Sequence, residues 1–288
     1  GRRAVKKILI LARMTFREAI RRKIVLAGLV LGVLFLAVYS IGFRMIYTEI
    51  SLEAAAAGGS IASLLVLREM SNFLLLAGLY AATFLSVAMG ALLSADTLAG
   101  EINSGTIQTI VAKPLRRSDV VLGKWLAFAG LLGLYLLLLA GGVVASVYFQ
   151  SGFVAQNLLR GLLLIYLEAL LMMTFALACS SAMTALATGG TVFGLYGLSF
   201  IGGWIEQIGS IFNNQTAVQV GIATSLLFPT EAMWRRATYE MQSAVSSVLQ
   251  MTPFVTLSVP NMVMIAYAVL YLLAALALAI RTFQNRDL

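Results

Sequence analysis

The chain has 288 residues, of which 60% are hydrophobic and 11% are charged, and its mean hydropathy is +0.94. Soluble globular domains carry about 25% charged residues, so these values exclude an ordinary soluble domain and predict an integral membrane protein. Histidine is absent and Cys179 is the single cysteine, which excludes intrachain disulfides, Cys/His metal cages and histidine-based catalysis. We expect no catalytic residue, no metal site and no bound cofactor.

The N-terminal segment from Ala4 to Lys23 separates into two faces on a helical wheel. The apolar face holds Val5, Ile8, Leu9, Ala12, Phe16, Ala19 and Ile20. The adjoining face holds Lys6, Lys7, Arg13, Arg17 and Arg21. This pattern predicts an amphipathic helix that lies in the membrane interface with its basic side toward lipid headgroups. A signal peptide is the alternative, but no small-residue cleavage site follows the next apolar run.

Six predominantly apolar runs are each long enough to cross a hydrocarbon core of about 30 Å. They are residues 24–43, 73–95, 120–148, 158–180, 184–205 and 261–280. The sequence therefore predicts an all-α membrane protein with six transmembrane helices in one transmembrane domain, 1–288. The charged segment 44–72 is expected to be an outer loop with a short surface helix. Gly28 and Gly32 form a GxxxG pattern in the first span, which favours close packing within the subunit over a dimer contact.

The polar segment 96–119 lies between the second and third spans. Its residues Thr106 to Ala112 are too few for a helix that is stable alone in water, yet Ile107, Ile110 and Val111 form one apolar stripe. Such a short helix needs a surface to pack against. Lys113 suits its negative end, and Pro114 ends it.

The next helix is expected to begin after Ser118 or Asp119, either of which can cap it. Gly123-Lys124 is not a phosphate-binding loop of the Walker A type, because Trp125 follows the lysine and Ser118 stands where the first glycine is needed. Any ATPase that drives this chain is therefore expected to be a separate polypeptide.

An acid and several turn and basic residues follow one another in this segment: Glu101, Gly105-Thr106, Lys113-Pro114, Arg116-Arg117 and Gly123-Lys124. Their order resembles the cytoplasmic loop of type-2 ABC exporter permeases. The resemblance implies an N-terminal elbow helix and a coupling helix that sits in a groove of a separate ABC ATPase, which binds ATP and Mg. It also implies a second permease copy. This chain has Ile102-Asn103 where the family often carries a basic residue after the acid.

The resemblance assigns ATPase coupling to the loop. Glu101 would make the polar contact with the ATPase, and Gly105 and Thr106 would allow a tight approach and start the coupling helix. The remaining residues of the coupling segment are Ile107, Ile110, Val111, Lys113 and Pro114.

Glu168 is the only acid inside a predicted span. An ionisable side chain at that depth is costly and usually faces protein or water. One hypothesis is that Glu168 lines a substrate path or links protomers through a hydroxyl such as that of Tyr196. The alternative is a buried, protonated and purely structural carboxyl.

The last third of the chain contains a glycine-rich span and a long outer segment, 206–260. Gly190, Gly194 and Gly202-Gly203 allow close packing or bending of the span. Thr230 is expected to cap a helix from 231 to about 249, which would lie on the membrane surface or shield an outer vestibule. The sequence Phe228-Pro229-Thr230-Glu231 is similar to that of permeases for nitrous oxide reductase maturation.

The basic residues predict the orientation. Of 20 Lys and Arg residues, 15 fall before the first span, in the 113–124 region or in the tail. This bias places both termini in the cytoplasm. We expect the membrane to be the cytoplasmic (inner) membrane of a bacterium or archaeon. The expected function is a permease subunit of an ABC exporter, with lipid as surroundings and no nucleic-acid partner. The alternatives are a non-transporting membrane anchor or assembly factor, and an ion-coupled secondary transporter that uses Glu168.

Overall fold

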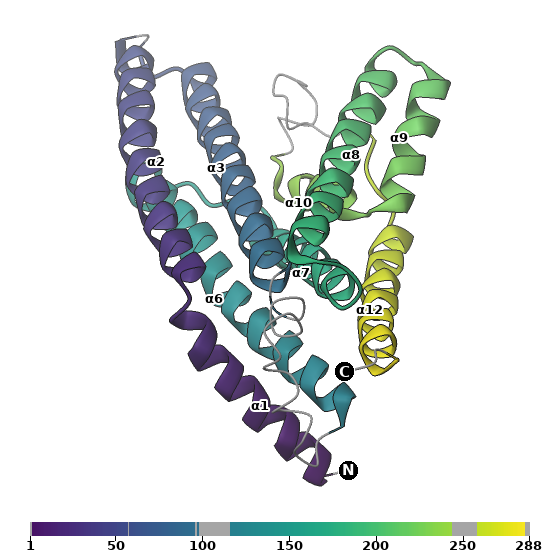
Figure 1. Cartoon of the computed structure of the whole chain (residues 1–288). Coiled ribbons are helices and arrows are strands. Elements are labelled where there is room, and N and C mark those ends of the chain that lie inside the picture. The colour runs from purple at the N-terminus through teal and green to yellow at the C-terminus, as the bar shows by residue number, and fades with distance from the viewer. Residues whose placement is uncertain (1, 57, 96, 98–115, 244–257, 286–288) are drawn as a thin grey trace.

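The computed structural model describes residues 2–56, 58–95, 97, 116–243 and 258–285, and every regular element in these ranges is a helix. The helices are α1 (Arg2–Ile20), α2 (Lys23–Ala56), α3 (Ile61–Ala95), α6 (Arg117–Ser151), α7 (Leu158–Ser180), α8 (Ala185–Ile211), α9 (Gln215–Leu227), α10 (Thr230–Met241) and α12 (Met262–Gln284). Figure 1 shows that both termini lie at the same end of the bundle.

Six of these helices are long and apolar enough to cross a membrane: α2, α3, α6, α7, α8 and α12. The predicted fold class, an all-α protein with six transmembrane helices, is confirmed. Two helix starts follow simple capping chemistry. Thr184 accepts a hydrogen bond from the backbone N–H of Ala187 ahead of α8, and Asn261 accepts one from Val263 ahead of α12.

The outer loop expected over residues 44–72 is wrong. The helix α2 continues to Ala56 and α3 already begins at Ile61, so most of this segment is helical. Charged residues flanking a span do not break a helix, and the chain has no breaker here before Gly58 and Gly59. These glycines have φ of +80° and +63°, values that other residues rarely adopt.

Two helix starts also differ from expectation. The residue before α6 is Arg116, whose side chain makes no capping bond, so Ser118 and Asp119 lie inside the first turn. The residue before α10 is Pro229, and Thr230 is the first helical residue instead of the cap. The helix α10 ends at Met241, and residues 244–249 of the expected longer helix lie outside the described ranges.

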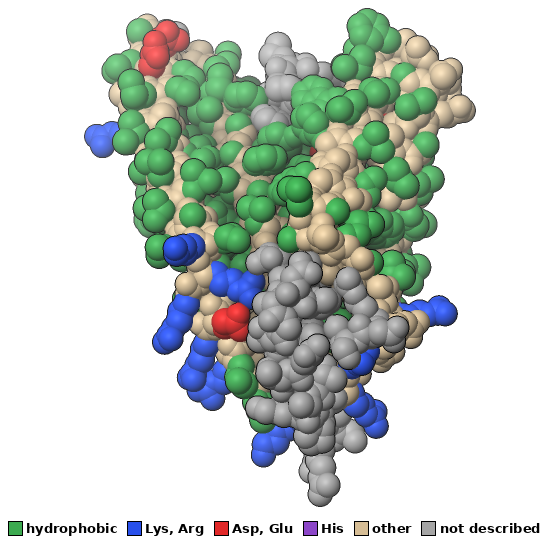
Figure 2. Space-filling model, viewed as in Figure 1, with side chains coloured by type: hydrophobic (Ala, Val, Ile, Leu, Met, Phe, Trp, Pro, Cys, Tyr) green, Lys and Arg blue, Asp and Glu red, His purple; other side chains and the backbone are tan. Residues whose placement is uncertain are grey.

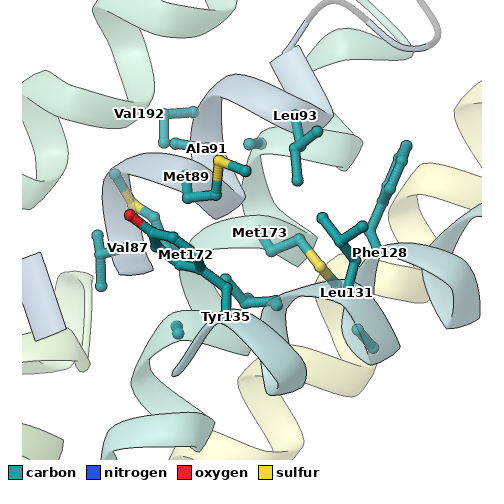
Figure 3. Packing of buried hydrophobic residues seen from close by; sticks show 14 of the residues in the cluster. Val87, Met89, Ala91, Leu93, Phe128, Leu131, Tyr135, Met172, Met173 and Val192 are labelled. Atoms are coloured by element: carbon teal, nitrogen blue, oxygen red, sulfur yellow. The ribbon is translucent and has the colours of Figure 1, made fainter. Parts of the chain in front are cut away.

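The core is built around α7, which packs against α3, α10 and α12. Figure 3 shows one part of this core, where methionines of α3 and α7 meet aromatic and aliphatic side chains of α6. The glycines Gly28 and Gly32 face this interior. A Cβ at Gly28 would lie 2.9 Å from the sulfur of Met89, and one at Gly32 would lie 2.9 Å from Leu139. The predicted packing of this GxxxG pattern within the subunit is confirmed.

The outer surface fits a lipid environment. Exposed large hydrophobic side chains cover much of the spans, whereas Lys and Arg side chains gather toward the end that carries the termini (Figure 2). The helix α1 does not lie free on this surface. It packs along the start of α6, and Ala19 is 1% exposed while Leu9 and Ile20 remain exposed.

Candidate functional site

The residues expected to contact an ATPase all fall in 98–115, outside the described part of the chain. These are Glu101, Gly105, Thr106, Ile107, Ile110, Val111, Lys113 and Pro114. The structure does describe the helices that carry this loop, α3 on one side and α6 on the other. We call the end of α3, the start of α6 and their described contacts the loop stems.

Side-chain hydrogen bonds join the loop stems to other helices at the same end of the bundle. The guanidinium of Arg117 donates to the backbone carbonyl of Gln284, 2.9 Å away, at the end of α12. Arg22, between α1 and α2, donates to the hydroxyl of Thr97 at 3.4 Å. The two stems are therefore linked to the first and last spans.

Close backbone packing adds a third link, between α6 and α1. A Cβ built on Gly123 would lie 2.7 Å from the Cβ of Leu11 and 3.3 Å from the carbonyl oxygen of Ile8. Real Cβ contacts are essentially never this close to a neighbouring Cβ, so only glycine allows α1 to approach α6 at this point. The glycine of the Gly123-Lys124 pair therefore serves helix packing.

A second candidate region lies in the bundle interior at the other end, where α10 folds back among the spans. The helix α10 packs against α7. Met241 packs on Gly161 near the start of α7, and the ring of Trp234 lies 4.8 Å from that of Tyr80 on α3. Nine of its twelve residues are buried. The membrane-surface position considered for this helix is therefore wrong.

An ion pair holds α10 to α8. The guanidinium of Arg235 contacts both carboxylate oxygens of Glu206, at 2.7 and 2.9 Å, and each side chain is 4% exposed. Arg235 also donates to the hydroxyl of Ser225 on α9, and Ser258 donates to Glu206. A buried charge is tolerated only with partners of this kind.

Hydroxyl groups and glycines bring α8, α9 and α10 together beside the ion pair. Ser199 donates to the carbonyl of Phe228 at 2.7 Å, and Thr230 donates to Ser199 at 3.2 Å. A Cβ at Gly203 would lie 2.3 Å from Cγ of Glu231. The predicted close packing at Gly202-Gly203 is confirmed, whereas a Cβ at Gly190 or Gly194 would meet nothing within 4 Å in the described chain.

Glu231 is a buried carboxyl in α10, which is not one of the six spans. Its pKa is raised from 4.5 to about 7, because the raising effects of burial, the largest cause, and of the charge of Glu206 outweigh the lowering effect of Arg235. The carboxyl therefore changes its charge near neutral pH.

Glu168 of α7 is 1% exposed, and its Oε2 atom has no hydrogen-bond partner among the described residues. It interacts electrostatically with Glu231 and with the hydroxyls of Tyr196 and Tyr80. Within the described ranges no hydrogen bond joins Glu168 to Tyr196. The structure thus brings the two predicted residues near one another, and their role in a substrate path stays a prediction.

The sequence analysis missed the buried charged cluster of Glu206, Glu231 and Arg235. It placed Glu206, Glu231 and Arg235 in an outer segment, although the structure buries them together. One signal was present: an acid and a base four residues apart share a helix face with Trp234 and Met241 close by, which favours a buried stripe as well as a surface one. No group of three or more residues suited to a metal ion occurs among the described residues.

These features define a multi-pass helical membrane protein with linked helix ends on either side of the polar segment 98–115 and a charged cluster inside the bundle. A scan against protein families matches residues 9–288 to the family described as ABC-2 family transporter protein. The chain belongs to this family, and it is therefore a type-2 ABC permease, the membrane subunit of an ABC transporter. A search of curated proteins found no match.

Proposed function

We propose that this permease works as an exporter in the cytoplasmic membrane of a bacterium or archaeon, with both termini in the cytoplasm. A separate ATPase binds ATP and Mg, and it acts on the permease through the segment 98–115. ATP binding would favour one arrangement of the spans, because a ligand shifts an equilibrium only by its differential affinity for the two states.

The observation that carries this proposal is the set of contacts at the loop stems. A displacement of the loop would reach α1 through Gly123, α12 through Arg117, and the start of α2 through Arg22 and Thr97. The three helices α1, α2 and α12 would therefore respond together with the two stem helices α3 and α6. This is the mechanical property that a coupling loop needs.

A second copy of the chain is part of the proposal. The face of α8 that carries Gly190, Gly194 and Gly197 has open space around it, and Phe84 on the adjacent α3 is 53% exposed. Small residues allow helices of two subunits to approach closely in lipid. Two such faces, one from each copy, would enclose a path between the subunits, near Glu168 and Tyr196.

The test uses the permease purified with its ATPase and reconstituted in nanodiscs. Scrambling residues 105–112 is expected to abolish coupled ATPase activity while the permease stays folded. Alanine at Ser60, which is exposed at the opposite end, serves as the control and is expected to leave activity unchanged. Unchanged activity after the scramble would reject coupling through this segment.

The orientation is tested separately with one cysteine at Gln108 in a Cys179→Ser background. A membrane-impermeant thiol reagent should label this cysteine only after the membrane is opened. Labelling in intact cells would place the loop outside and would overturn the proposed orientation. Transport that depends on an ion gradient and not on ATP would favour the secondary-transporter alternative instead.

A further inference from the structure

A cavity of about 400 Å³ lies where α9, α10 and the start of α12 meet. Its volume falls within the range of about 300–1,000 Å³ that is typical of ligand pockets. Glu206 and Arg235 form part of its wall, and the apolar side chains of the wall include Ile222, Leu226, Val263 and Met264. The cavity therefore joins a charged group to an apolar lining.

Several apolar residues of this cavity are exposed at the surface of the described chain. Val263 is 69% exposed, Leu226 is 48% exposed and Ile222 is 45% exposed. The hydroxyl of Tyr267 donates to the carbonyl of Leu226 at 2.5 Å, so the end of α9 is fixed against α12 at the cavity. A hydrocarbon chain can reach the lining directly from the bilayer.

The depth of the cavity also suits a lipid. Met262, the first residue of α12, is 19 positions before Arg281, which corresponds to about 28 Å along the helix axis. This length nearly equals a hydrocarbon core of about 30 Å. The cavity therefore lies in the leaflet opposite the termini, where the ester region and headgroup of a phospholipid are close at hand.

The charges on the wall select the headgroup. The guanidinium and the carboxylate contact one another through two atoms each, so the pair carries no net charge. The adjacent Glu231 can add only negative charge to this region. An anionic head would be repelled, whereas a zwitterionic head can present its phosphate to Arg235 and its ammonium to Glu206.

We propose that this cavity binds one zwitterionic phospholipid, with its headgroup against the Glu206–Arg235 pair and an acyl chain along Ile222, Leu226 and Val263. The lipid holds α10 together with the end of α9 and the start of α12. This site does not depend on how the transporter is driven or on what it carries.

The test uses phosphatidylethanolamine with a photoreactive diazirine on one acyl chain, in nanodiscs that contain the purified permease. Mass spectrometry is expected to find the label on peptides of α9 and the start of α12. Val263→Trp fills the cavity and should lower this labelling about tenfold. Val269→Trp is the matched control, because Val269 is exposed on the same helix and does not line the cavity.

A second pair of variants guards against misfolding. Ile222→Trp should also block labelling, whereas Ala223→Trp, at the exposed neighbouring position, should not. Unlabelled phosphatidylethanolamine should compete better than phosphatidylglycerol at pH 8. Equal labelling of Val263→Trp and wild type, or label spread evenly over all exposed spans, would overturn the site. Equal competition by phosphatidylglycerol would overturn the choice of headgroup.

Discussion

The carboxylate of Glu206 and the guanidinium of Arg235 meet at 2.7 and 2.9 Å across 29 positions of sequence, with both side chains almost fully buried. The pair fixes α10 against α8, inside the bundle. Because Arg235 also donates to Ser225 and Glu206 also accepts from Ser258, the pair connects four segments of the chain.

Removal of one partner should destabilise the protein strongly. Arg235→Met leaves the carboxylate of Glu206 buried without its counter-charge, and the expected loss is about 3–5 kcal/mol. The double variant Glu206→Met with Arg235→Met removes both charges and should recover most of this loss. Thermal unfolding, monitored by size-exclusion chromatography, measures the stability of the single and the double variant. A double variant no more stable than Arg235→Met would contradict the assignment.

Stability should depend on pH through Glu231. Its folded pKa is about 7 and its ordinary value is 4.5, so between these values the folded state holds a proton that the unfolded state has lost. The stabilising contribution is therefore present below pH 4.5 and is lost as pH rises to about 7, with a size on the order of 3 kcal/mol. Glu231→Gln should remove this dependence and make the protein more stable than wild type at pH 8. Parallel pH profiles of the two proteins would exclude a raised pKa at Glu231.

Two substitutions of Glu168 test its effect on stability and its role in transport separately. A buried polar atom without a partner costs about 1–3 kcal/mol, so Glu168→Leu should raise the unfolding temperature. Glu168→Gln keeps the shape and should lower coupled transport if this residue lines the path. Glu49→Gln, at an exposed site on α2, is the control. Full transport by a normally assembled Glu168→Gln protein would remove the path role.

Two glycines of α8 should respond in opposite directions to the same change. Gly203→Ala places a methyl group against Glu231, and the expected loss is about 1–3 kcal/mol. Gly197→Ala meets open space and should gain about 0.5–1 kcal/mol from helix propensity. Unfolding temperatures of monomeric protein in detergent compare the two. Equal effects would mean that α10 does not pack on α8 at Gly203.

The packing of α1 on α6 should matter for coupling. Gly123→Val forces α1 away from α6, because its Cβ would meet Leu11 and the backbone of Ile8. The expected result is a loss of ATPase stimulation in the reconstituted complex. Gly130→Val is the control. Gly130 lies on the same helix, α6, and a Cβ at this position would meet nothing within 4 Å in the described chain. Similar activity of the two variants would exclude α1 from the coupling path.

The spans could be predicted from the sequence because hydrophobic length is a local property. The run from Leu158 to Ser180 coincides with α7, and the starts of α8 and α12 follow the capping residues Thr184 and Asn261. The helix ends beyond the bilayer could not be read in the same way. Polar composition after residue 43 suggested a loop, although a helix persists in water until a breaker such as Gly58.

The sequence by itself determined that this is an integral membrane protein with six spans and a costly acid at position 168, since composition and run length fix these features. Only the tertiary structure decided that α10 turns back into the bundle and that Glu168 lies near Glu231, with Glu206 and Arg235 paired beside them. The physical reason is that a helix with charges and apolar residues fits a membrane surface or a buried polar pocket equally well. Which of the two positions the helix takes depends on contacts with residues that are distant in sequence.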